Sequence, residues 1–170
     1  KTEQVVSTEQ TAADFLEQAQ GLPSAQAMPL LISASELFFK ENNHAKSLWL
    51  AEQLLPLTDT DTQRYQLNVL KAQNLYLLSE YELALAALNN ASAIKATSKD
   101  EQYYKLLANI QSARGLALIA ADANLRVLQT STESQDINAL WQQLNELSQW
   151  QIEQLVAMNP PHVKGWQQLL

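Results

Sequence analysis

The sequence predicts an all-α fold in which antiparallel helix pairs stack on one another as a solenoid. Between residues 38 and 127 the chain repeats a pattern of helix, tight turn and helix three times, with turns at Asn42, Ser79 and Gly115. These turns are 37 and 36 residues apart (79 − 42 and 115 − 79), and a period in this range indicates a helical repeat protein. The composition agrees, because Leu, Ala, Gln and Glu favour helices and the chain holds only three Gly and five Pro.

One short helix is predicted ahead of the repeats. Residues 1–10 are polar and without periodicity, so we expect a disordered segment or a linker there. Thr11 and Asp14 have the spacing of a capping box, which predicts a helix over residues 11–20. The Gly-Leu-Pro sequence at 21–23 ends that helix.

The first repeat is expected to start at Pro29, a residue that the first turn of a helix tolerates. Its first helix runs to about Glu41, and the Asn42 turn follows. The second helix covers residues 44–55 and ends at Pro56, which cannot continue a helix.

The later elements follow the same plan. The expected caps are Thr58 with Asp61, Ser98 with Glu101, and Ser148 with Gln151. The expected helices cover residues 63–78, 83–91, 98–113 and 116–128, and after a polar break at 130–134 three shorter ones lie around 137–147, around 152–156 and after Pro160-Pro161. We therefore expect helical repeats over 11–132 and, in the same domain, C-terminal helices over 133–170.

Small residues at the predicted helix crossings make the repeats TPR-like. The six positions are Ser35, Ala72 and Ala108 in the first helices and Ser47, Ala84 and Ala120 in the second helices. Such side chains let helix axes approach to about 8–9 Å. Bulky neighbours stand at Phe38 and Leu75, whereas the third equivalent position holds Gln111.

Charge and composition exclude several functions. The net charge is −7, so the chain lacks the basic face that binding nucleic acid or anionic lipid requires. It has no Cys, and its two histidines, His44 and His162, are far apart in sequence, so we expect no metal site. Three isolated Gly cannot form a phosphate-binding loop, and no apolar run approaches the roughly 20 residues that span a bilayer. We expect no cofactor, no catalytic residue and no enzyme activity.

In a helical repeat of this kind, the polar sides of the first helices line a concave wall. The repeat places eight residues there, which are Glu36, Phe39, Lys40, Gln73, Tyr76, Lys105, Asn109 and Ser112. They form a possible partner-binding face, a groove of mixed charge for a peptide or protein. The alternative is an ordinary solvated face.

The C-terminal third carries a family resemblance. In DINALWQQLNELSQWQIEQLV, Ile137 is paired with Trp141, and in KGWQQLL, Gly165-Trp166 is paired with Leu169. Together with SARG at 112–115 and LWLAEQLLP at 48–56, these segments make the chain resemble the N-terminal domain of the LpoA family over about residues 12–170. Fold-determining roles are expected for the following residues: Ala72, Ala84, Trp141, Gly165 and Trp166.

The resemblance implies a lipoprotein on the periplasmic side of the outer membrane, held by an N-terminal lipid anchor. Members activate class A penicillin-binding proteins, which are peptidoglycan synthases, and they continue into a larger domain similar to periplasmic binding proteins. We therefore expect the chain to be part of a longer protein. Its expected partners are the synthase and its own second domain, and catalysis belongs to the synthase.

Three other functions stay open. The chain could be a generic TPR-like adaptor that binds peptide segments in its concave groove. It could be a helical appendage of an enzyme. It could also contact nothing and serve only as a stiff spacer that holds the next domain at the right height.

Overall fold

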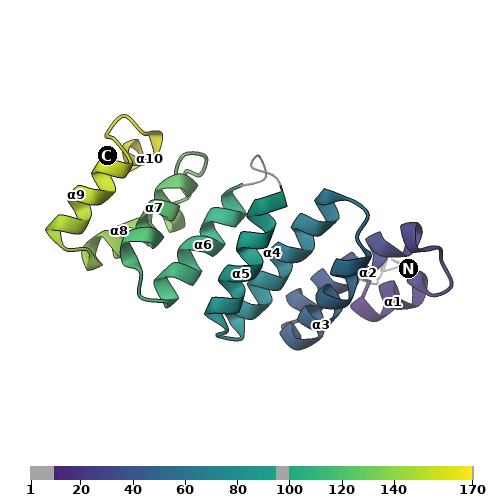
Figure 1. Ribbon diagram of the computed structural model, residues 1–170. Helices are drawn as coiled ribbons and strands as arrows, with labels where there is room; N and C mark the ends of the chain where they lie inside the picture. Colours follow the sequence, from purple (N-terminus) through teal and green to yellow (C-terminus); the bar gives the residue numbers. More distant parts are fainter. Residues whose placement is uncertain (1–9, 95–99, 170) are drawn as a thin grey trace, which may run out of the picture.

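The computed structural model describes residues 10–94 and 100–169, and the described residues contain helices and no strand. The all-α prediction is therefore confirmed. The helices follow one another in a row, with α1 at one end and α9 and α10 at the other (Figure 1). The segment expected to be disordered, residues 1–10, lies outside the described residues except for its last member.

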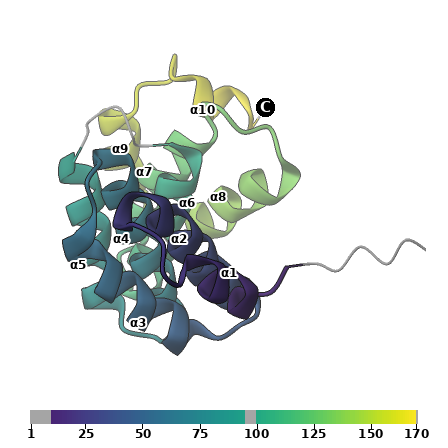
Figure 2. The ribbon, with the colours of Figure 1, turned by 90° about the vertical axis from the view of Figure 1, so that its right-hand side faces the viewer.

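The bounds of the helices are α1 (Ala12–Ala19), α2 (Ser24–Lys40), α3 (His44–Leu54), the 3-10 helix η1 (Leu55–Leu57), α4 (Asp61–Leu77), α5 (Tyr81–Ile94), α6 (Glu101–Ala113), α7 (Ala117–Val127), α8 (Ser134–Glu146), α9 (Gln149–Met158) and α10 (Lys164–Gln167). Each helix from α1 to α7 packs against the next one, and α9 and α10 pack against α7. Helices α2, α4 and α6 are the first members of three successive pairs, and α4 contacts both α2 and α6. Seen along the row in Figure 2, α5 and α8 lie on opposite sides of the molecule.

The three predicted turns are confirmed, and they share one conformation. Asn42, Ser79 and Gly115 all have positive φ, at 60°, 64° and 76°. In each turn the backbone N–H that follows reaches back five residues, as from Asn43 to the carbonyl of Phe38 at 2.8 Å. This is the Schellman ending of a helix, which satisfies carbonyls that the helix leaves free. The repeat in the sequence is therefore a repeat of backbone geometry.

The predicted crossing residues lie where the helices of each pair meet. Ala72, Ala84 and Ala120 have no exposed surface, and Ala108 is 1% exposed. Between α4 and α5, Ala84 belongs to a core cluster that also includes Leu88 and reaches α6. A larger side chain at these positions would force the helices apart.

The first pair uses serines instead of alanines at its crossing. The buried Ser35 Oγ donates to the carbonyl of Ser47 at 2.9 Å, and Asn74 Nδ2 donates to Ser47 Oγ at 2.8 Å. Asn74 also donates to the carbonyl of Leu70 at 2.9 Å. Buried hydroxyls require such partners, so this network joins the first pair to α4.

The third pair replaces the bulky neighbour with an ionic contact. Gln111 is buried, and its Oε1 accepts a hydrogen bond from Arg114 Nη1 at 2.7 Å. Arg114 also binds both carboxylate oxygens of Glu82 on α5, at 2.7 and 3.1 Å. Gln111, which stands where the other pairs have an apolar residue, therefore binds the arginine that connects α6 to α5.

The predicted start of the first repeat is wrong. Pro29 is the sixth residue of α2, which already begins at Ser24. The preceding turn brings Ala27 and Met28 into the core, where Met28 packs in the same cluster as Ala12 of α1. This burial outweighs the helical hydrogen bond that a proline removes.

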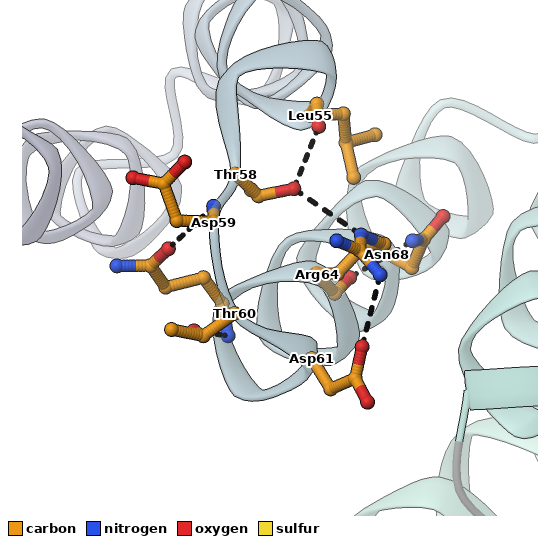
Figure 3. A network of polar contacts seen from close by, with 8 residues as sticks. Leu55, Thr58, Asp59, Thr60, Asp61, Arg64 and Asn68 are labelled. Atoms are coloured by element: carbon orange, nitrogen blue, oxygen red, sulfur yellow. Dashed lines mark hydrogen bonds and ion pairs between the residues drawn. The ribbon is translucent and has the colours of Figure 1, made fainter. Parts of the chain in front are cut away.

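The predicted caps of the second and third repeats also differ in part. Helix α4 is capped by Thr60, whose Oγ1 accepts from Gln63 N at 3.2 Å. Thr58 instead donates to the carbonyl of Leu55 at 2.8 Å and accepts from Arg64 Nε at 3.4 Å (Figure 3).

Helix α6 is capped by Asp100, whose Oδ1 accepts from Tyr103 N at 2.9 Å. The proposed cap Ser98 lies outside the described residues. The capping boxes of α1 and α9 are both confirmed.

The C-terminal helices dock on α7 through individual contacts. A Cβ on Gly165 would lie 2.4 Å from the carbonyl oxygen of Leu125, so only glycine permits this approach of α10 to α7. The indole N–H of Trp166 donates to the carbonyl of Asn159 at 2.7 Å, and Asn159 Nδ2 donates to Asp122 Oδ1 at 2.7 Å. Gly165 and Trp166 thus hold the end of the described chain in place.

Trp141, one of the expected fold-determining residues, does not pack in the core. Its side chain is 47% exposed, and the buried side of α8 carries Asp136, Leu140 and Gln143. Gln143 accepts a hydrogen bond from the buried Asn124 at 2.8 Å. The buried side of α8 is therefore centred on Leu140, next to Trp141 in the sequence, and it includes polar side chains that bond to α6 and α7.

Candidate interaction groove

A groove runs over the exposed sides of α2, α4 and α6. It consists of two open cavities of about 650 Å³ and 380 Å³, which share Phe39, Gln73 and Gln102. The groove is lined by Glu36, Phe39 and Lys40 from α2, by Tyr65, Gln66, Val69, Leu70, Gln73, Tyr76 and Leu77 from α4, and by Asp100, Glu101, Gln102, Lys105, Leu106 and Asn109 at α6. Among the described residues, the lining therefore comes from the first helices of the three pairs and from Asp100, the cap of α6.

The residues expected on the concave face are mostly brought together in this groove. The larger cavity contains Phe39, Gln73, Tyr76, Lys105 and Asn109, and the smaller one contains Glu36, Phe39, Lys40 and Gln73. Ser112 lines neither cavity. It lies exposed near the end of α6, one turn beyond Asn109.

Sequence reasoning missed several lining residues, among them Gln66 and Gln102. The signal that could have found them is spacing, because Gln66 precedes Gln73 and Gln102 precedes Asn109 by seven residues. Seven residues are about two helical turns, so each pair lies on one side of its helix. Extending the predicted face one heptad backward on α4 and α6 would have included both.

Two aromatic residues of the groove lining are held by contacts with neighbouring rings. The ring of Phe39 meets that of His44 edge to face, with centroids 5.3 Å apart. The ring of Tyr76 contacts that of Tyr81 at 5.9 Å. Because these neighbours lie at the turns of the first two pairs, the turn geometry also positions the aromatic lining.

Lys105 is held in an ionic cluster at the edge of the larger cavity. Its Nζ lies 2.7 Å from Glu101, 2.9 Å from Asp136 and 3.8 Å from Glu133. Asp136 is buried and also accepts a hydrogen bond from Ser131. The hydrogen bond that Lys105 donates to Glu101 raises the pKa of Lys105, burial opposes this rise, and Asp136 adds to it. The ammonium therefore serves to join α6 to α8.

The carboxylates of the lining are also engaged. Asp100 caps α6 and accepts a long hydrogen bond of 3.5 Å from Tyr65. Burial, together with the negative charge of Asp100, raises the pKa of the Tyr65 phenol to about 12. Glu36 on α2 accepts a hydrogen bond from Gln66 on α4. These contacts connect α4 to α2 and to the start of α6 along the groove.

Three amide side chains of the lining remain available. Gln73, Gln102 and Asn109 form no hydrogen bond with any other residue in the described part of the chain. Within residues 10–94 and 100–169, no group of three acidic or histidine side chains is arranged to hold a metal ion. The groove can therefore form hydrogen bonds to a partner beside apolar and aromatic surface.

The fold and the groove define an all-helical protein made of consecutive helix pairs, with a polar and aromatic groove along its first helices. The family model described as LppC putative lipoprotein matches residues 5–170. The chain therefore belongs to this lipoprotein family, which is the family of LpoA N-terminal domains. No curated protein and no solved structure matches the chain.

Among the described helices, none has both the length and the apolar character needed to cross a membrane.

Proposed function

We propose that the chain is a non-catalytic regulatory domain of a lipoprotein that stimulates a class A penicillin-binding protein, a peptidoglycan synthase, from the periplasmic side of the outer membrane. The observation that carries this proposal is the family match over residues 5–170. In the full-length protein, an N-terminal lipid anchor and a second domain similar to periplasmic binding proteins would complete the activator. Catalysis would belong to the synthase.

We further propose that the three helix pairs from α2 to α7 form a TPR-like solenoid. Left-handed turns of similar conformation, 37 and 36 residues apart (79 − 42 and 115 − 79), support this interpretation. So do the small buried residues at each helix crossing. A solenoid presents an extended surface to a partner, which suits a regulator.

Two ways of acting fit the observations. The groove across α2, α4 and α6 favours an interaction module that contacts the synthase. The row of helices, with the described ends far apart (Figure 1), favours a stiff spacer that holds the second domain. The groove would equally serve a generic adaptor for peptide segments.

Surface plasmon resonance of the 170-residue chain against the periplasmic portion of its class A penicillin-binding protein tests the proposal. The longer two-domain protein is the positive control. Saturable binding by the chain supports the interaction module, and binding by the longer protein alone supports the spacer. If neither protein binds, the proposed partner is wrong.

A further inference from the structure

We propose that the groove binds an extended, internal segment of a protein partner and that the side-chain amides of Gln73, Gln102 and Asn109 hydrogen-bond to the backbone of that segment. The inference deepens the proposed function, on which it rests, by naming the chemistry of the contact. These three amides face one cavity of about 650 Å³ and have no hydrogen-bond partner among the described residues. A side-chain amide has both donors and an acceptor, so it matches a peptide group.

The spacing of the amides fits an extended chain. Gln102 and Asn109 are separated by seven residues of α6, which corresponds to about 10.5 Å along the helix axis. An extended peptide rises about 3.3 Å per residue, so three of its residues cover nearly the same distance. Gln73 lines the same cavity from α4 and would supply a contact from a second helix.

Apolar surface beside the amides accounts for side-chain recognition. Tyr76 and Leu77 line the cavity on the α4 side, and Leu106 lines it on the α6 side. Recognition of extended peptides generally combines backbone hydrogen bonds, which supply affinity, with pockets for alternate side chains, which supply specificity. The larger cavity offers both.

The charges of the larger cavity disfavour the carboxylate at the end of a peptide chain. Lys105, the only cation that lines this cavity among the described residues, is already bound to Glu101 and Asp136 at 2.7 and 2.9 Å. A terminal carboxylate would also meet the nearby Asp100. An uncharged backbone avoids both penalties, and this is why we assign an internal segment.

The test uses 12-residue peptides that tile the periplasmic portion of the class A penicillin-binding protein, acetylated and amidated at their ends. Binding to the 170-residue chain is measured by fluorescence anisotropy. We expect at least one peptide to bind, and its version with a free C-terminal carboxylate to bind no more tightly. The triple variant Gln73→Ala/Gln102→Ala/Asn109→Ala should weaken binding at least tenfold, because each lost hydrogen bond costs about 1 kcal/mol and about 1.4 kcal/mol is tenfold.

The matched control is the triple variant Gln53→Ala/Gln142→Ala/Gln154→Ala, which removes three exposed amides that do not line the groove and should leave the affinity unchanged. Circular dichroism checks that both variants keep their helix content. If the synthase portion binds the chain but no peptide does, or if the groove variant binds as well as the wild type, the inference is overturned and the proposed function stands. Binding of soluble glycan strands in place of peptides would likewise overturn it. If neither the synthase portion nor any peptide binds the 170-residue chain, the inference is overturned, and the proposed function fails as well only if the longer two-domain protein also does not bind the synthase portion.

Discussion

The helix pairs from α2 to α7 and the C-terminal helices α8–α10 are stabilised in different ways. The same arrangement occurs in all three pairs: a left-handed turn joins two helices that cross at small buried residues. The C-terminal helices use contacts that occur once each, such as Gly165 against the Leu125 carbonyl and Asn159 with Asp122. The difference teaches that periodic contacts spread stability along the chain, whereas single contacts concentrate it at a few residues.

The largest expected effect is in the paired region. Leu88 of α5 has no exposed surface and belongs to the cluster that joins α4, α5 and α6. Leu88→Ala should lower the free energy of unfolding by about 2–5 kcal/mol, because it leaves a cavity. Chemical denaturation measures this loss. Leu83→Ala on the same helix is the control, since Leu83 is 56% exposed, and an equal loss in both variants would contradict the assigned core.

In the C-terminal region, Gly165→Ala should be the most harmful small change. The new Cβ would collide with the carbonyl of Leu125, and overpacking of this kind costs about 1–3 kcal/mol. Hydrogen exchange should accelerate in α10 and α9 and stay slow in α4 and α5. Gln167→Ala, at an exposed site of the same helix, is the control. Uniform acceleration along the whole chain would show that the two regions unfold together.

Lys105 supplies one of the contacts between the two regions. Lys105→Met leaves the buried Asp136 without its cation, and we expect a loss of about 1.5 kcal/mol, the lower end for a charged hydrogen bond because Lys105 is partly exposed. Lys40→Met is the control, since Lys40 forms no ion pair with any described residue. Thermal unfolding compares the two variants.

The pH dependence of that loss follows from the raised pKa of Lys105. A lysine whose folded-state pKa exceeds its unfolded value of about 10.4 contributes its full stability below that value and loses it as pH rises through the folded-state pKa. The difference between wild type and Lys105→Met should therefore be constant from about pH 6 to pH 9 and shrink only above about pH 10. A difference that disappears below pH 9 would contradict the ionic cluster.

The smallest effects come from equivalent caps in the two regions. Thr60→Ala and Ser148→Ala each remove a hydroxyl that accepts a backbone N–H at the start of a helix, α4 and α9 respectively. Each change should cost about 1 kcal/mol. In the first variant, faster hydrogen exchange should extend from α4 into α5. In the second variant, it should stay within α9. The reverse pattern would contradict the distinction between shared and single contacts.

The periodic features could be predicted from the sequence because they depend on local properties. Tight turns at Asn42, Ser79 and Gly115 and small residues such as Ala72 and Ala84 follow from repetition alone. The position of Trp141 did not follow, because α8 is oriented by the buried polar contacts of Asp136 and Gln143 with distant helices.

The groove was predicted in outline and not in its chemistry. The repeat identified the sides of α2, α4 and α6 that line it, including Gln73 and Asn109. It did not reveal that Lys105 is bound to α8 through Asp136, because that contact joins a repeat to a helix outside the repeat. Charge patterns in one sequence do not show which ions are already paired.

Hydrogen–deuterium exchange of the 170-residue chain, with and without the periplasmic portion of the class A penicillin-binding protein, tests the central claim most directly. The account predicts slower exchange in α2, α4 and α6, which line the groove, and unchanged exchange in α9 and α10. The groove variant Gln73→Ala/Gln102→Ala/Asn109→Ala should lose that protection. Protection confined to α8–α10, or no protection in any described helix, would contradict the claim that this domain contacts the synthase through its groove.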